Sequence, residues 1–73
     1  MKTVSDLHLT RLHHDKGTGY DNYCARTRGE YEAAVREAEG YLPGARVVRI
    51  RAGYACISYL ADGKRDLFFL SQE

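Results

Sequence analysis

Arginines and aromatic residues in the C-terminal third of the chain are the residues whose types and spacing could do chemistry. Arg49 and Arg51 alternate in one predicted strand, Tyr54 follows a two-residue turn, and Lys64 and Arg65 follow the next strand. Arginine offers forked donors to phosphates and carboxylates and stacks on aromatic rings. Such a surface on an open sheet is also used to hold single-stranded RNA. The alternative is that alternating arginines form only the solvated side of an antiparallel strand.

The histidines, cysteines and glycines predict neither a metal site nor a catalytic centre. His13 and His14 are adjacent and would point to opposite faces of a strand, and the Cys and His spacings do not fit a zinc site. Cys24 and Cys56 lie within predicted strands, where thiols usually pack, so we expect both to be free and reduced. The Gly-Thr-Gly sequence at 17–19 lacks the lysine and helix of a phosphate-binding loop. We therefore expect a protein that is not an enzyme and has no cofactor or metal.

Length and composition predict one small globular domain over residues 1–73. The chain is 44% hydrophobic and 29% charged, an ordinary balance for a folded protein. A chain of 73 residues has a thin core, which argues against a deep enclosed active site. The net charge of +1 counts somewhat against direct DNA binding. Because the sequence has neither a membrane-length apolar run nor a signal-peptide pattern, we expect a cytoplasmic protein of a bacterial host.

Five strands and one helix are predicted from hydrophobic periodicity and turn residues, in the order ββαβββ. The strands have alternating or β-branched patterns bounded by turn residues. They are expected at 6–12, 20–27, 46–51, 54–60 and 65–70. The helix begins with the capping box Thr27–Glu30 and ends before Pro43. The expected fold is α+β, a single antiparallel sheet with one helix packed on one face.

The turns between the last three strands predict which side chains face away from the helix. A two-residue loop at 52–53 puts Arg51 opposite Tyr54 and Arg49 opposite Cys56, so that Arg49, Arg51 and Tyr54 point away. The side chains expected to point toward the helix are Val48, Ile50, Ala55 and Ile57.

The phenylalanines of the last strand cannot both enter the core. Phe68 and Phe69 are adjacent, so one of them must face away from the helix, and exposed apolar groups often mark interfaces. The choice depends on whether Asp62-Gly63 forms a two-residue turn or a bulged three-residue loop. The candidate binding residues are Arg49, Arg51, Tyr54, Lys64, Arg65 and Phe69.

Two stretches of the C-terminal half, Val-Val-Arg-Ile at 47–50 and Ile-Ser-Tyr-Leu-Ala-Asp-Gly-Lys-Arg at 57–65, resemble small phage-encoded type I anti-CRISPR proteins. The resemblance covers less than half of the chain. It implies a curved antiparallel sheet beside one helix, binding to the Cas7 backbone of a Cascade surveillance complex, and blocked pairing with target DNA. The basic residues implied to face the grooves for guide RNA and target DNA are Arg49, Arg51, Lys64 and Arg65.

The sequence thus predicts a binding protein rather than an enzyme, and three hypotheses stay open. The first is a phage or mobile-element inhibitor, an anti-CRISPR that binds a Cascade-type complex and blocks target DNA recognition. The second is a small nucleic-acid-binding domain that uses the arginine and tyrosine face of the sheet. The third is an antitoxin-like or structural homodimer. The expected partner is a bacterial protein or nucleoprotein complex, with nucleic acid as a further candidate and no membrane, and the chain is a monomer or homodimer.

Overall fold

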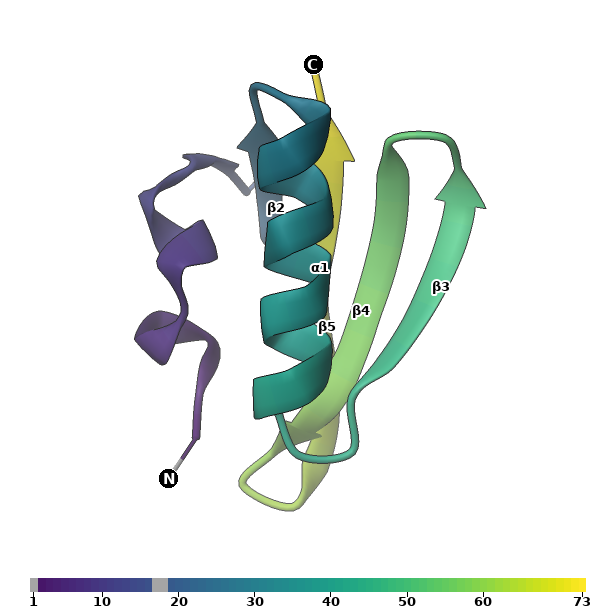
Figure 1. Cartoon of the computed structure of the whole chain (residues 1–73). Coiled ribbons are helices and arrows are strands. Elements are labelled where there is room, and N and C mark those ends of the chain that lie inside the picture. The colour runs from purple at the N-terminus through teal and green to yellow at the C-terminus, as the bar shows by residue number, and fades with distance from the viewer. Residues whose placement is uncertain (1, 17–18) are drawn as a thin grey trace.

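The computed structural model describes residues 2–16 and 19–73 and shows a five-stranded sheet with one helix lying across a single face (Figure 1). The ββαβββ order and the α+β class are as predicted. The predicted turn at 15–19 lies partly outside the described residues. The elements are the 3-10 helices η1 (Val4–Asp6) and η2 (His8–Arg11), strands β1 (His13–Asp15) and β2 (Asn22–Ala25), helix α1 (Arg28–Tyr41), and strands β3 (Arg46–Arg51), β4 (Tyr54–Ala61) and β5 (Lys64–Gln72).

Helix α1 begins and ends where the sequence places it. The Thr27 hydroxyl accepts a hydrogen bond from the backbone N–H of Glu30 at 3.1 Å, which confirms Thr27 as the N-cap. The Glu30 carboxylate accepts from the N–H of Arg26 at 2.9 Å, one residue before the donor that a capping box uses. Leu42 is the C-cap and Pro43 follows it. The buried helical residues that face the sheet are Tyr31, Ala34, Val35 and Ala38.

Removing the N-cap hydroxyl should weaken the whole domain measurably. Thr27→Ala leaves the Glu30 N–H without its side-chain acceptor, and the expected loss is about 1 kcal/mol in the free energy of unfolding. Urea denaturation measures this loss, and Thr27→Ser serves as the control because it keeps the hydroxyl. Equal stability of the alanine and serine variants would show that the cap contributes nothing.

The sheet is mixed, which corrects the prediction of an entirely antiparallel one. Its strand order is β1-β2-β5-β4-β3, and β2 pairs with β5 in parallel, whereas the other neighbours are antiparallel. The reason is topological. Helix α1 carries the chain back along the sheet, so β3 starts in the direction of β2. The two hairpins that follow then return β5 to the same direction.

The predicted first strand over 6–12 is wrong, because this segment forms η1 and η2 beside α1 (Figure 1). Local side-chain bonds favour the turns: the Asp6 carboxylate accepts from the N–H of Thr3 at 3.0 Å, and the Thr10 hydroxyl donates to the Leu7 carbonyl at 2.8 Å. Leu7 and Leu9 are still buried in the core. The second strand is also shorter than the predicted range 20–27.

The register between β3 and β4 is correct at the turn and wrong beyond it. Arg51 lies opposite Tyr54 as predicted, but the pairing shifts between Arg49 and Arg51, so that Arg49 faces Ala55. One extra residue in a strand moves the following side chains to the other face. Ile50 is this extra residue. Val47 rather than Val48 then packs against the core.

The β4–β5 turn decides between the two phenylalanines. Asp62 and Gly63 both have positive φ, 52° and 79°, as a two-residue type I′ turn requires. This turn places Phe68 opposite Ile57 in the core and Phe69 opposite Cys56 on the face away from α1. The two-residue alternative is therefore the correct one.

The N-terminal segment is fastened to α1 by a pair whose contribution depends on pH. The Glu37 carboxylate accepts from the backbone N–H of His8 at 2.8 Å and lies 2.6 Å from its Nδ1. The hydrogen bond with the His8 ring, together with the backbone bond, lowers the pKa of Glu37 below its ordinary 4.5. A lowered carboxyl pKa stabilises the fold above the ordinary pKa, and this contribution disappears as the pH falls through the folded value.

Acid should therefore weaken the parent protein more than a variant without this carboxylate. Between neutral pH and about pH 3, Glu37→Gln should show a smaller drop in the urea midpoint than the parent. Glu39→Gln, an exposed change two residues along the helix, is the matched control. An identical pH dependence for the parent and Glu37→Gln would contradict the linkage.

Candidate functional site

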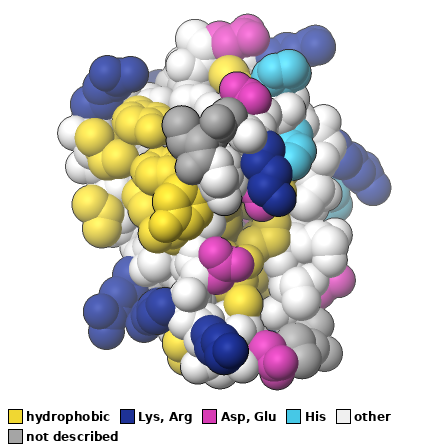
Figure 2. Space-filling view, turned by 180° about the vertical axis from the view of Figure 1, so that it is seen from behind, with side chains coloured by type: hydrophobic (Ala, Val, Ile, Leu, Met, Phe, Trp, Pro, Cys, Tyr) yellow, Lys and Arg dark blue, Asp and Glu magenta, His cyan; other side chains and the backbone are white. Residues whose placement is uncertain are grey.

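The face of the sheet away from α1 is the candidate site, and it is covered by no other element of the described chain. Figure 2 shows hydrophobic side chains gathered over this face. Among the residues that the structure describes, the most exposed large hydrophobic side chains are Val48 at 60%, Ile50 at 50% and Tyr20 at 48%. We call this surface the apolar patch; its residues are Tyr20, Val48, Ile50, Tyr54, Cys56 and Phe69.

Stacked aromatic rings form the centre of the apolar patch. The rings of Tyr54 on β4 and Phe69 on β5 lie with centroids 5.7 Å apart and planes 16° apart. The Arg51 guanidinium lies over the Tyr54 ring from β3, 5.2 Å from the centroid. Tyr20 meets Phe69 edge-on, with centroids 6.2 Å apart. Because β3 and β5 flank β4 on opposite sides, neighbours cover the Tyr54 ring from both sides.

Basic residues border the apolar patch at its two ends, and Figure 2 shows Lys and Arg side chains beside it. Arg51 stands at the β3–β4 turn, while Lys64 and Arg65 begin β5 at the opposite end of β4. Arg46 lies opposite Ser58, on the same face of β3 as Val48. The Arg65 guanidinium donates to the Gly44 carbonyl at 2.6 Å. In the part of the chain that the structure describes, none of these four cations pairs with a carboxylate.

The structure brings four of the six predicted binding residues to this face: Arg51, Tyr54, Arg65 and Phe69. Lys64 lies opposite Ala61 and shares the helix side of β5 with Phe68, so its predicted place on the open face is wrong. Arg49 also lies elsewhere. Its guanidinium donates to both oxygens of Glu32, at 3.0 and 3.3 Å, on the helix side of the sheet. It also lies 5.9 Å from the centroid of the Tyr31 ring. The Glu32 carboxylate raises the pKa of Arg49. The prediction that Arg49 faces away from the helix is therefore wrong, and the bulge at Ile50 is the cause.

The prediction that Val48 and Ile50 point toward the helix is wrong, since both are exposed, and no pattern in the sequence indicated Tyr20. The run of β-branched residues and arginines at 46–51 fits either face, so its pattern gives no signal for the bulge. Tyr20 precedes β2 and shows no periodicity with it. The orientation of Arg49 had one indication in the sequence. Glu32 lies off the apolar stripe of the predicted helix, where its carboxylate can form a salt bridge with an arginine that faces the helix.

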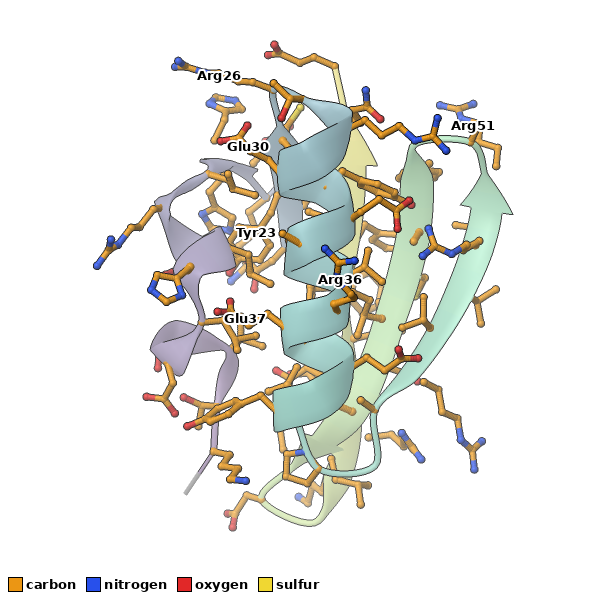
Figure 3. All side chains as sticks on the ribbon, viewed as in Figure 1. Tyr23, Arg26, Glu30, Arg36, Glu37 and Arg51 are labelled. Atoms are coloured by element: carbon orange, nitrogen blue, oxygen red, sulfur yellow. The ribbon has the colours of Figure 1, made fainter. Side chains whose placement is uncertain are left out.

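A cleft of about 670 Å³ opens between α1 and the tip of the β3–β4 hairpin. Arg51, at this tip, borders both the cleft and the apolar patch (Figure 3). The lining side chains include three arginines and two glutamates, of which Arg49 and Glu32 neutralise each other. The residues around the opening are Arg28, Tyr31, Glu32, Arg49, Arg51, Ala52, Gly53, Gln72 and Glu73.

The thiols and acidic groups do not gather into a reactive centre. Cys24 and Cys56 are free, and β5 lies between their strands. Burial raises the pKa of the Cys56 thiol, which disfavours the nucleophilic thiolate. Residues 2–16 and 19–73 hold no group of three or more His, Cys, Asp or Glu side chains arranged to bind a metal ion.

The described helices also include none that is long and apolar enough to cross a membrane. Comparisons with protein families, with characterised proteins and with solved structures find nothing similar to this chain.

Proposed function

We propose that the chain is a non-enzymatic binding protein that docks onto a partner protein through the apolar patch. The observation that carries the proposal is the exposure of Val48, Ile50 and Tyr20 around a stacked aromatic pair. Leaving such groups in water is unfavourable, and contiguous exposed apolar surface on a small domain usually marks an interaction site. Aromatic and arginine side chains also dominate the binding energy of protein interfaces.

The geometry favours a protein partner over single-stranded nucleic acid. Base stacking requires an aromatic ring with a free face. The Tyr54 ring is covered by Arg51 from one side and by Phe69 from the other. The most exposed patch residues, Val48 and Ile50, are aliphatic, and the net charge is only +1. Aliphatic side chains contribute little to binding a polyanion but much to a protein interface core.

The first partner to test is the Cas7 backbone of a Cascade-type surveillance complex, with the chain acting as a phage or mobile-element inhibitor. The support is the resemblance of 47–50 and 57–65 to small type I anti-CRISPR proteins. These stretches lie in β3, in β4 and at the β4–β5 turn. They therefore overlap the strands that carry most of the apolar patch and its basic border.

A reconstituted assay tests this function directly. Purified Cascade is incubated with the chain and then with a labelled target duplex, and DNA binding is followed by gel shift. Inhibition at stoichiometric protein is the expected result. A chain that co-purifies with Cascade but leaves DNA binding unchanged would contradict the inhibitor role.

Two further measurements separate the other hypotheses. Retention of labelled single-stranded RNA or DNA by the chain alone would favour the nucleic-acid-binding hypothesis. A concentration-dependent dimer in sedimentation, lost on mutation of the apolar patch, would favour the homodimer.

A further inference from the structure

Strand β3 is the long edge of the sheet. The strand order places β3 at one edge and β1 at the other, and β1 spans only His13–Asp15. Within the described chain, the backbone of β3 bonds to β4 and to no other segment. An edge strand of this kind presents unpaired N–H and C=O groups that can pair with a strand of another protein.

The alternation of hydrogen bonds along the strands shows which backbone groups of β3 point away from β4, toward the open edge of the sheet. The N–H of Leu60 donates at 2.8 Å to a carbonyl oxygen in the loop that precedes β3. In an antiparallel sheet, every second residue of a strand directs its backbone N–H and C=O toward the same neighbour. Every second residue of β4 before Leu60 therefore directs these groups toward β3. Cys56 is one of them, and Val48 lies opposite it. The backbone groups of Val48 therefore point toward β4, and those of Val47 and Arg49 point outward.

The charge on this edge selects the partner strand. Arg46 and Arg51 have no carboxylate partner in the described chain, whereas Arg49 is neutralised by Glu32. A second copy paired antiparallel along β3 would set arginines against arginines, which is unfavourable. An acidic strand would instead place carboxylates beside these cations.

The surroundings of β3 can accommodate such a strand. Val48 extends the apolar patch to the sheet edge, so an aliphatic side chain of an added strand would pack beside it. The bulge at Ile50 ends regular pairing after Arg49. Beyond that point the cleft between α1 and the hairpin tip offers Arg28 and Arg51 to a carboxylate.

We infer that the β3 edge receives an extended, acidic segment of the partner protein, which adds to the sheet as a further strand. Its carboxylates lie near Arg46 and Arg51, and an aliphatic side chain between them contacts Val48. This inference rests on the proposed function, because the added strand continues the interface formed by the apolar patch.

A peptide titration tests the edge without the natural partner. The probe is an acetylated and amidated peptide, Glu-Thr-Val-Thr-Glu-Thr, whose two glutamates and valine share one face of an extended strand. It is added to the ¹⁵N-labelled chain, and the control peptide has lysine in place of both glutamates. The expected result is that the acidic peptide shifts the amide resonances of Val47 and Arg49 and slows their hydrogen exchange. Shifts confined to another surface, or an equal response to the lysine peptide, would overturn the inference.

Charge reversal provides the matched variants. Arg51→Glu should weaken binding of the acidic peptide at least tenfold, whereas Arg36→Glu on the exposed side of α1 should leave it unchanged (Figure 3). An equal loss in both variants would mean that net charge alone draws the peptide, which contradicts strand addition.

Docking through the apolar patch and strand addition at the β3 edge can be contradicted independently of each other. If the peptide does not bind while changes in the apolar patch abolish partner binding, only the edge inference is wrong. If the peptide binds at β3 while those same changes leave partner binding intact, the proposed docking through the patch is wrong.

Discussion

Replacing both Val48 and Ile50 with aspartate is expected to abolish partner binding while the domain remains folded. Both side chains are at least half exposed, so the new carboxylates stay hydrated in the free protein. In the complex they would lie unpaired in the apolar centre of the interface, where burying a charge is very costly. We expect at least a hundredfold weaker binding, roughly 2.7 kcal/mol. Gel shift with Cascade, or titration against any partner recovered from a lysate, measures this loss.

The cost to folding should be small by comparison. Aspartate fits a strand less well than valine or isoleucine, by up to about 1 kcal/mol at each site. Far-ultraviolet circular dichroism and the thermal midpoint establish whether the variant is folded. Ala33→Asp, on the exposed side of α1, is the matched control and should bind like the parent. A folded double variant with parental affinity would show that the apolar patch is not the docking surface.

Changes at Val48 and Ile50 test the docking surface more specifically than changes at the arginines of β3, as Arg49 illustrates. Reversing the charge of Arg49 would set a carboxylate against Glu32, so a loss of binding could follow from a disturbed helix–sheet contact. Arg51 lies over Tyr54 and borders the cleft as well, so its loss affects two surfaces. Val48 and Ile50 are exposed, and neither lines the cleft nor contacts an ion pair with the helix, so a change there reports on the apolar patch more directly.

Elements with local causes could be predicted from the sequence. The start of α1 depends on a hydroxyl three residues before the N–H that it caps, and the β4–β5 turn depends on an Asp-Gly pair that tolerates positive φ. Both signals lie within four residues. The start of the helix and the β4–β5 turn follow from them, and hydrophobic periodicity, another local pattern, predicts the α+β class.

Elements with non-local causes could not be predicted. The parallel contact of β2 with β5 joins Asn22 to Phe69, and no local pattern reveals such a pairing. The bulge at Ile50 accompanies the packing of Val47 against a core whose other residues are distant in the sequence, so the local pattern does not reveal it. The candidate site was therefore predicted in part: Tyr54 and Phe69 were found, whereas the face of Arg49 was assigned wrongly.

The two adjacent phenylalanines should respond to alanine in opposite ways. Phe68 is 1% exposed and meets the rings of Tyr23 and Tyr59 edge-on, with centroids 5.7 and 6.0 Å away. Removing its ring leaves a cavity between the sheet and α1, and such a change costs about 3–5 kcal/mol. A domain of this size has little more stability than that, so Phe68→Ala is expected to unfold largely at room temperature.

Phe69→Ala should instead stay folded and lose partner binding. Its ring is only partly buried on the open face, where it supports Tyr54 from one side. Urea unfolding of the two variants measures the contrast, and Phe68→Leu supplies a folded comparison because it keeps most of the buried volume. Removing the Phe69 ring frees one side of Tyr54, so the loss should appear as faster dissociation from the partner. Equal destabilisation by the two alanine changes would contradict the assignment of Phe68 to the core and Phe69 to the docking face.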